Sequence, residues 1–382
     1  MKKITALLLA LLMLVGALAG CGKQNDTNKT DKLSIVTTIF PEYDWVREIL
    51  GDKADNAEVT MLLDNGVDLH SYQPTADDIV KISDCDLFVY AGGESDGWVD
   101  DALKNATNKN MKVINLLDVL GDSVKTEEVV EGMQETEHDH DHDHSKEVST
   151  FEDDEVQDRS LSDWAGDFPA DMTGEEICEH MERHDHDEDE DHEHKEGEEH
   201  EHEEEKDEHV WLSLKNAEVL VNAISKSLQE LDPDNKDTYA TNAAAYIEKL
   251  SALDGEYQAA VDAATYKTVL FGDRFPFRYL VDDYGLSYYA AFVGCSAETE
   301  ASFETVSFLA KKVDELKLPC VLTIEGAQHK IAETIVQNTA EKNQKVLTMD
   351  SMQSTTSKDV ANGTTYLSVM EKNLSVLKEA LG

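Results

Sequence analysis

The chain's longest helical pattern reads PDNKDTYATNAAAYIEKLSALDGEYQAAVDAA, from Pro233 to Ala264. Its larger apolar residues recur three or four positions apart, which places them on one face of a helix. Asp232-Pro233 sets the start, because proline is tolerated in a first helical turn. At 1.5 Å per residue the helix would be roughly 45 Å long, enough to cross a whole domain. The residues expected on the buried face are Tyr239, Ala243, Tyr246, Leu250, Leu253 and Tyr257.

Short apolar, β-branched runs alternate with helical patterns on both sides of this helix. Such alternation is typical of a parallel sheet in an α/β fold. We therefore predict two parallel-sheet α/β lobes linked by one long helix. The predicted strands are 33–39, 57–63, 87–90 and 112–115 before the helix, and 268–271, 286–291, 320–324 and 346–349 after it.

A His-rich acidic segment interrupts the first lobe. Twelve of the fourteen histidines fall between His138 and His209. Dense imidazole favours zinc, copper or nickel over calcium and magnesium, which take oxygen ligands. We expect a disordered insert at 127–208 that binds metal weakly; the plainer alternative is a solvated acidic segment. The expected auxiliary ligands are His138, His140, His142, His144, His184, His186, His192, His194, His200 and His202.

The charge of the chain points to cations as partners. The formal net charge is -48, and residues 127–209 alone hold 37 acids and five bases, a balance of -32. A charge of this sign argues against nucleic acid or anionic lipid as a partner, and it raises the local concentration of divalent ions.

The first residues have the pattern of a lipoprotein export signal. Lys2 and Lys3 precede an apolar run, too short for a comfortable membrane span, that ends in Leu18-Ala19-Gly20-Cys21. We predict a signal peptide at 1–20, a lipidated Cys21 and a tether at 21–32. The alternative is a plain signal peptide with a chance cysteine. The mature protein is thus expected at the outer face of the cell membrane, or in a periplasm.

Two histidines outside the densest runs lie in loops. His70 lies in VDLHSYQPTADD, directly after a predicted strand, where ligands bind in α/β sheets. His209 lies in HVWLSLKNA, just before a helix. A lone histidine is more often structural, but two such loops in a histidine-rich chain favour a metal site.

Together these features resemble the zinc- and manganese-binding solute-binding proteins of bacterial ABC importers, the ZnuA/AdcA-like lipoproteins. The resemblance runs from about Leu33 to Leu381, except for the middle of the insert. It implies lobes at 33–126 and 267–382, connecting helices at 209–266, and one metal held between the lobes by His70, His209 and C-lobe ligands. It also implies a monomer that works with an ABC permease and its ATPase.

The C-lobe ligands are where this chain departs from the family. The family usually has a histidine in a motif like HDAFGYL, whereas this chain reads FGDRFPFRYLVDDYGL from Phe271. Asp273 is our expected substitute, although it could instead pair with Arg274 or cap a helix. The resemblance also matches Asp350 and Glu325 to family acids, and it leaves His329 out.

The expected function is capture of Zn(II) and its delivery to a permease. Carboxylate ligands leave Mn(II) as an alternative, and a metal buffer or adhesin is another. A metallohydrolase is disfavoured because the chain has no H-E-x-x-H and no nucleophile motif, so we expect no enzyme. Val156 to Met172 resembles the opening of ZinT zinc-binding domains. The disulfide state of Cys85, Cys178, Cys295 and Cys320 stays open.

Overall fold

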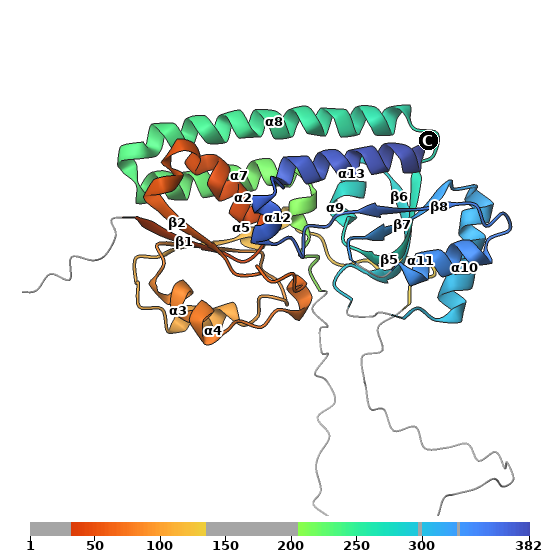
Figure 1. Ribbon diagram of the computed structural model, residues 1–382, viewed down its shortest axis with the longest axis horizontal. Coiled ribbons are helices and arrows are strands. Elements are labelled where there is room, and N and C mark those ends of the chain that lie inside the picture. Colours follow the sequence, from red (N-terminus) through yellow and green to blue (C-terminus); the bar gives the residue numbers. More distant parts are fainter. Residues whose placement is uncertain (1–31, 135–204, 297–299, 327–328) are drawn as a thin grey trace, which may run out of the picture. The chain divides into compact units, whose positions relative to one another are not determined.

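The computed structural model describes residues 32–134, 205–296, 300–326 and 329–382 (Figure 1). The predicted signal peptide, Cys21, the ten auxiliary histidines and the ZinT-like segment lie outside these residues. None of the helices in the described ranges combines the length and the apolar character that a membrane span requires.

The N-lobe is a four-stranded parallel sheet in the order β2-β1-β3-β4. Its central strands β1 and β3 are the most apolar and buried, as is usual where helices cover both faces of a parallel sheet. Figure 1 shows α3 and α4 on one side and α2 on the other. The elements are β1 (Leu33–Thr37), α2 (Phe40–Leu50), β2 (Ala57–Met61), α3 (Ala76–Asp84), β3 (Leu87–Tyr90), α4 (Val99–Lys104), β4 (Lys112–Asn115) and α5 (Leu116–Leu120).

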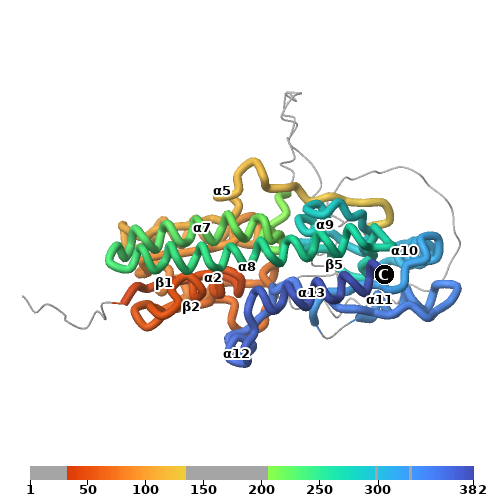
Figure 2. Tube along the Cα trace, turned by 90° about the horizontal axis from the view of Figure 1, so that it is seen from above, coloured from red at the N-terminus to blue at the C-terminus, as the bar shows by residue number. Residues whose placement is uncertain are grey.

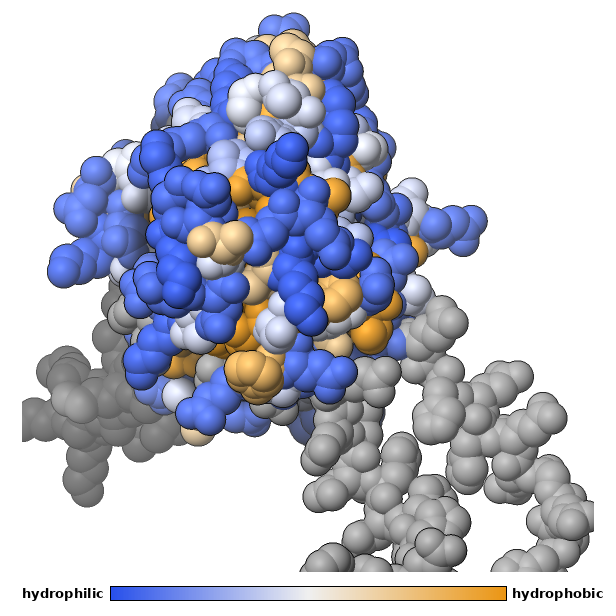
Figure 3. Space-filling model, turned by 90° about the vertical axis from the view of Figure 1, so that its right-hand side faces the viewer, coloured by the Kyte–Doolittle hydropathy of each residue, from blue (hydrophilic) through white to orange (hydrophobic). Residues whose placement is uncertain are grey.

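The C-lobe repeats the arrangement with a parallel sheet in the order β6-β5-β7-β8. Its elements are β5 (Thr268–Phe275), α9 (Arg278–Tyr284), β6 (Ser287–Val293), α10 (Phe303–Leu316), β7 (Cys320–Ile324), α11 (Lys330–Asn338) and β8 (Lys345–Met349). The short α12 (Ser357–Ala361) comes after β8 and lies against the N-lobe, where Ser357 donates to Asp64. The prediction of two parallel-sheet α/β lobes is confirmed. Figure 3 shows hydrophilic side chains dominating the C-lobe end, with small apolar areas between them.

The long helix is α8 (Lys236–Ala263), which follows α7 (Leu214–Leu231). It contacts α2 and α7 at one end, and α9 and α13 at the other (Figure 2). Its predicted apolar face is buried from Tyr239 to Tyr257, as expected. The predicted link between the lobes is therefore confirmed.

A second helix, α13 (Tyr366–Leu381), also spans both lobes, which the sequence did not indicate. It runs beside α8 and contacts α2 of the N-lobe as well as strands of the C-lobe (Figure 1). The start of α13 is fixed to α2, because the ring of Tyr366 stacks edge-on against Trp45 at a centroid distance of 5.2 Å. The backbone N–H of Tyr366 also donates to Asp44 Oδ2 at 2.9 Å. Two helices, rather than one, thus hold the lobes together.

The buried Asp44 at this junction predicts a pH-dependent stability. Burial raises the pKa of Asp44 from 3.8 to about 6. The folded state therefore binds more protons than the unfolded chain in this window, and stability falls as the pH rises through it. We expect a loss on the order of 3 kcal/mol in the free energy of unfolding between about pH 4 and pH 6. Asp44→Asn should remove this part of the loss in urea unfolding. The exposed Asp52→Asn is the matched control, and equal pH slopes for Asp44→Asn and wild type would contradict the expectation.

A third connection is an extended segment, residues 124–134, that we call the strap. Thr126 forms an antiparallel bridge with Lys206. At its far end the backbone N–H of Gln134 donates to Ala291 O of β6 at 2.9 Å. Arg278 of α9 pairs with Glu128 midway. We assigned residues 127–134 and 205–208 to the insert. In the structure both segments contact the C-lobe, and they are hydrogen-bonded to each other. The boundaries of the predicted insert stay a prediction.

Candidate metal centre

His70 lies in a 3-10 turn, Leu69–Ser71, directly after the N-lobe loop that follows β2. Asp68 caps the turn, because its Oδ1 accepts a hydrogen bond from the backbone N–H of His70 at 3.1 Å. The imidazole Nδ1 lies 2.8 Å from Ser95 Oγ. These contacts fix the ring and leave Nε2 facing the cleft between the lobes.

His209 lies between residues 205–208, which pair with the strap, and α7. Its side chain is fully buried. Asp207 Oδ1 accepts hydrogen bonds from the backbone N–H of His209 (2.9 Å) and from the Nδ1 of the same histidine (2.8 Å). A carboxylate on the outer nitrogen fixes the ring orientation of metal-binding histidines and makes them better donors. His209 is therefore held with Nε2 free to face His70.

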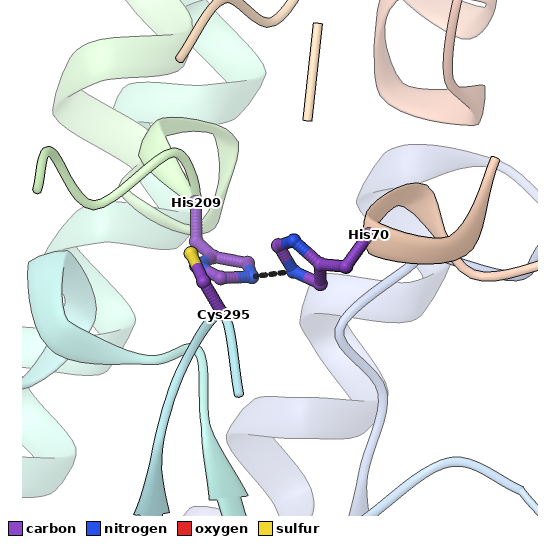
Figure 4. Close-up of side chains that lie close together, drawn as sticks. All are labelled: His70, His209 and Cys295. Carbon is purple, nitrogen blue, oxygen red and sulfur yellow. Dashed lines mark hydrogen bonds between the residues drawn. The ribbon is translucent and has the colours of Figure 1, made fainter. Parts of the chain in front are cut away.

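The two Nε2 atoms lie 3.2 Å apart (Figure 4). Around a tetrahedral zinc with Zn–N bonds of about 2.05 Å, two ligand nitrogens are about 3.3 Å apart. The described arrangement therefore has the spacing of two ligands on one ion. It joins residues that are 139 positions apart in the sequence.

Gln353 of the C-lobe lies across both imidazoles and is 2% exposed. With the amide assigned to the orientation that satisfies its neighbours, its nitrogen donates to His70 Nε2 at 3.2 Å and faces both carboxylate oxygens of Asp68 at 3.3 Å. Its amide oxygen accepts from His209 Nε2 at 3.0 Å. Gln353 therefore bridges the two Nε2 atoms from the C-lobe side.

The two histidines differ in their affinity for protons. Burial, together with the charge of His209, lowers the pKa of His70 to about 3, so its ring is neutral. Burial alone would lower the pKa of His209, but the charges of Asp207, Glu208 and Glu127 outweigh it and raise the pKa. The carboxylates around His209 thus favour positive charge beside its ring.

Cys295 follows β6 and is the third metal-ligand side chain in this group. One ligand atom from each of His70, His209 and Cys295 lies within 4.8 Å of the other two. Figure 4 shows the cysteine beside the ring of His209. In the part of the chain that the structure describes, this is the one group of three or more His, Cys, Asp or Glu side chains with such spacing.

Arg274 connects the two sides of the centre. Its Nη2 pairs with Asp68 Oδ2 at 2.7 Å, and its Nη1 donates to the backbone oxygen of Ser296 at 3.3 Å. Asp68 caps the turn that carries His70, and Ser296 follows Cys295. The guanidinium therefore holds the N-lobe and C-lobe loops of the site against each other.

The chain matches known proteins over nearly its whole length. The family model ZnuA, "Zinc-uptake complex component A periplasmic", matches residues 35–380. The chain belongs to the ZnuA family. It is 32% identical to the zinc-binding lipoprotein AdcA of Streptococcus pneumoniae over 99% of this chain, but it spans only 61% of that protein. It is 28% identical to the high-affinity zinc uptake system protein ZnuA of Bacillus subtilis, over 95% of this chain and 93% of that one.

The fold also matches solved structures of the ZnuA family. The Zn(II)-bound ZnuA-like domain of Streptococcus pneumoniae AdcA has a TM-score of 0.59 and 28% identity. The match covers 92% of this chain and 99% of that domain. The likeness therefore extends over both lobes.

In this member of the ZnuA family, Asp273 is directed away from the two histidines. Its Oδ2 accepts a hydrogen bond from Thr323 Oγ1 at 2.5 Å, and Thr323 in turn lies 3.2 Å from His329 Nδ1. The pairing of β5 with β6 shifts register between Phe271 and Arg274. Near this irregularity Asp273 bonds to Thr323 of β7, whereas Arg274 reaches Asp68 of the N-lobe.

Glu325 and Asp350 lie behind the site rather than among its nearest donors. Glu325 accepts hydrogen bonds from Ser351 N (2.7 Å), Ser351 Oγ (2.6 Å) and Gln353 N (3.3 Å). Burial, and then the charge of Asp350, raise the pKa of Glu325 to about 7. Asp350 Oδ1 accepts from Met352 N at 2.8 Å. Both acids thus shape the loop that carries Gln353.

Our sequence reasoning missed Gln353, Cys295 and the role of Arg274. Gln353 has a recognisable signal, because DSMQ directly follows β8, and strand ends in α/β sheets bind ligands. Cys295 likewise follows β6. We gave most attention to acids in these positions and passed over an amide and a thiol.

Proposed function

We propose that this protein captures Zn(II) between its lobes and delivers it to a membrane permease driven by an ATPase. The observation that carries this proposal is the pair of Nε2 atoms 3.2 Å apart, each on a ring whose other nitrogen is held by a partner. This spacing is that of two nitrogen ligands around one tetrahedral zinc. The names of the relatives support the choice of zinc.

The nature of the nearest donors favours Zn(II) over Mn(II). Carboxylate-rich sites suit manganese, whereas imidazole and thiolate suit zinc. On the C-lobe side, the groups beside the two histidines are the amide of Gln353 and the thiol of Cys295. Asp273, Glu325 and Asp350, which would have drawn the preference toward manganese, bond to other partners.

The remainder of the proposal concerns the setting in which the protein works. We propose that Cys21 carries the lipid anchor, that the protein lies outside the cytoplasmic membrane, and that it binds its permease as a monomer. Its role is binding and transfer without catalysis. The His-rich run would hold further ions weakly, in addition to the tight site.

The experiment that tests this function is removal of the His-rich run. Replacing 135–204 with a Gly/Ser linker spares the bridge between Thr126 and Lys206. We expect one tightly bound zinc per chain to remain and the additional weaker zinc to disappear in calorimetric titration. Manganese should bind the shortened chain more weakly than zinc. Loss of all tight binding in a folded variant would contradict a site between the lobes.

A further inference from the structure

The thiol of Cys295 is the C-lobe group that stands with the two histidines in the metal-ligand cluster. Around a tetrahedral zinc, a nitrogen and a sulfur ligand are about 3.6 Å apart, given Zn–N and Zn–S bonds of about 2.05 and 2.3 Å. The ligand atoms here lie within 4.8 Å of one another. The difference is at most about 1 Å, which a change of the side-chain torsion can cover.

We propose that Cys295 supplies a thiolate ligand to the ion held by His70 and His209, and that this ligand makes the site select zinc over manganese. The inference rests on the proposed function, since it concerns the same ion. It assigns the C-lobe contribution to a residue type different from the carboxylates expected from the sequence.

The backbone around Cys295 is built to approach His209 closely. A Cβ added to Gly294 would lie 3.0 Å from His209 Cε1 and 3.1 Å from its Nδ1. Only glycine therefore lets the end of β6 come this near to the ring without displacement. The backbone N–H of Cys295 donates to Glu127 Oε1 of the strap at 2.8 Å, and Arg274 holds the next residue's carbonyl. The close approach at Gly294 and these two hydrogen bonds together fix the turn that presents the thiol.

The surrounding charge favours a cation over a free thiolate. Burial and the charges of Glu127, Glu208 and Asp207 raise the pKa of Cys295 well above its usual range. The same carboxylates attract a divalent ion, and a coordinating thiol is deprotonated by its metal. On binding, a metal–sulfur bond would replace the S–H bond, and the thiol proton would be released.

Cobalt(II) absorption tests the assignment directly, because only a thiolate ligand gives a sulfur-to-cobalt charge-transfer band. The full chain should carry Cys21→Ser and Cys178→Ser, which leaves Cys85, Cys295 and Cys320. We expect the first equivalent of Co(II) to produce the band, Cys295→Ser to abolish it, and Cys320→Ser to keep it. Cys320 is the matched control, since it is a buried C-lobe cysteine at the start of β7.

Zinc and manganese affinities distinguish the failure of this inference from the failure of the proposed function. We expect Cys295→Ser to weaken zinc binding about tenfold or more and to leave manganese binding unchanged, because serine keeps an oxygen but removes the soft donor. Two results for Cys295→Ser would overturn the role of Cys295: a retained cobalt band, or a zinc affinity equal to that of wild type. If His70→Ala still loses zinc in the same measurement, the proposed function stands. If Cys295→Ala also loses the preference for zinc over manganese, the result supports the thiolate role of Cys295.

Discussion

Replacing His209 with alanine should weaken the tight zinc site by at least about 100-fold, more than the ~10–100-fold typical of losing an outer-shell partner. His209 provides one of two nitrogens that lie at ligand spacing, and it is fully buried. Its removal takes away a donor and leaves the Asp207 carboxylate without its imidazole. Calorimetric titration of the chain lacking 135–204 measures the change without interference from the His-rich run.

A second measurement separates lost binding from lost folding. An ion that binds only the folded state stabilises it by about 4 kcal/mol when present at a thousand times its dissociation constant. Wild type should show such a zinc-dependent rise in stability, and His209→Ala should not. His70→Ala should match His209→Ala, whereas His329→Ala, whose ring contacts Thr323, should behave like wild type. A full zinc response in either His70→Ala or His209→Ala would sink the two-histidine site.

Trp211→Ala should cause the largest loss of stability, about 3–5 kcal/mol in the free energy of unfolding. The side chain is fully buried two residues after His209. Its indole N–H donates to Ser351 O at 2.8 Å, and its own carbonyl accepts from Tyr366 OH at 2.6 Å. One residue thus joins the His209 segment to the Gln353 loop and to α13.

Trp211→Phe separates the two parts of this role. The phenyl ring keeps most of the buried apolar volume but leaves the carbonyl of Ser351 without its donor, at a cost of about 1–3 kcal/mol. We expect Trp211→Phe to lose less stability than Trp211→Ala in urea unfolding and still to bind zinc more weakly than wild type. Because the loop with Gln353 would lose an anchor, wild-type zinc affinity in Trp211→Phe would contradict this link.

Much of the fold could be predicted because the lobes bury apolar strands between helices. Leu87–Tyr90 was predicted to the residue, since all four side chains are buried. The prediction for β5 stopped at Phe271, whereas the strand reaches Phe275. The missing part contains Gly272, where an added Cβ would lie 2.5 Å from the Cα of Ala332 in α11. A glycine required by helix packing looks like a strand end in the sequence.

The candidate site was less predictable because its donors come from distant segments. The loops of His70 and His209 stand out by their composition, and their pairing followed from the family resemblance. On the C-lobe side, Asp273 bonds within its own lobe and Arg274 reaches across to Asp68, close to a register shift in β5. No local pattern of residues records that choice. Hydrogen bonds across the fold, such as those from Arg274 to Asp68 and Ser296, settle the geometry.

The connections between the lobes have a thermodynamic consequence for the cargo. If the lobes were independent, an arriving ion would have to order them, and its observed affinity would be reduced by that entropy. Here α8, α13 and the strap already order them, so the donors are preorganised before the ion arrives. Affinity for the cargo is thereby linked to the folding of distant helices. A substitution at the junction of Tyr366 and Asp44 should therefore lower the affinity for the ion, although neither residue lies among the proposed ligands.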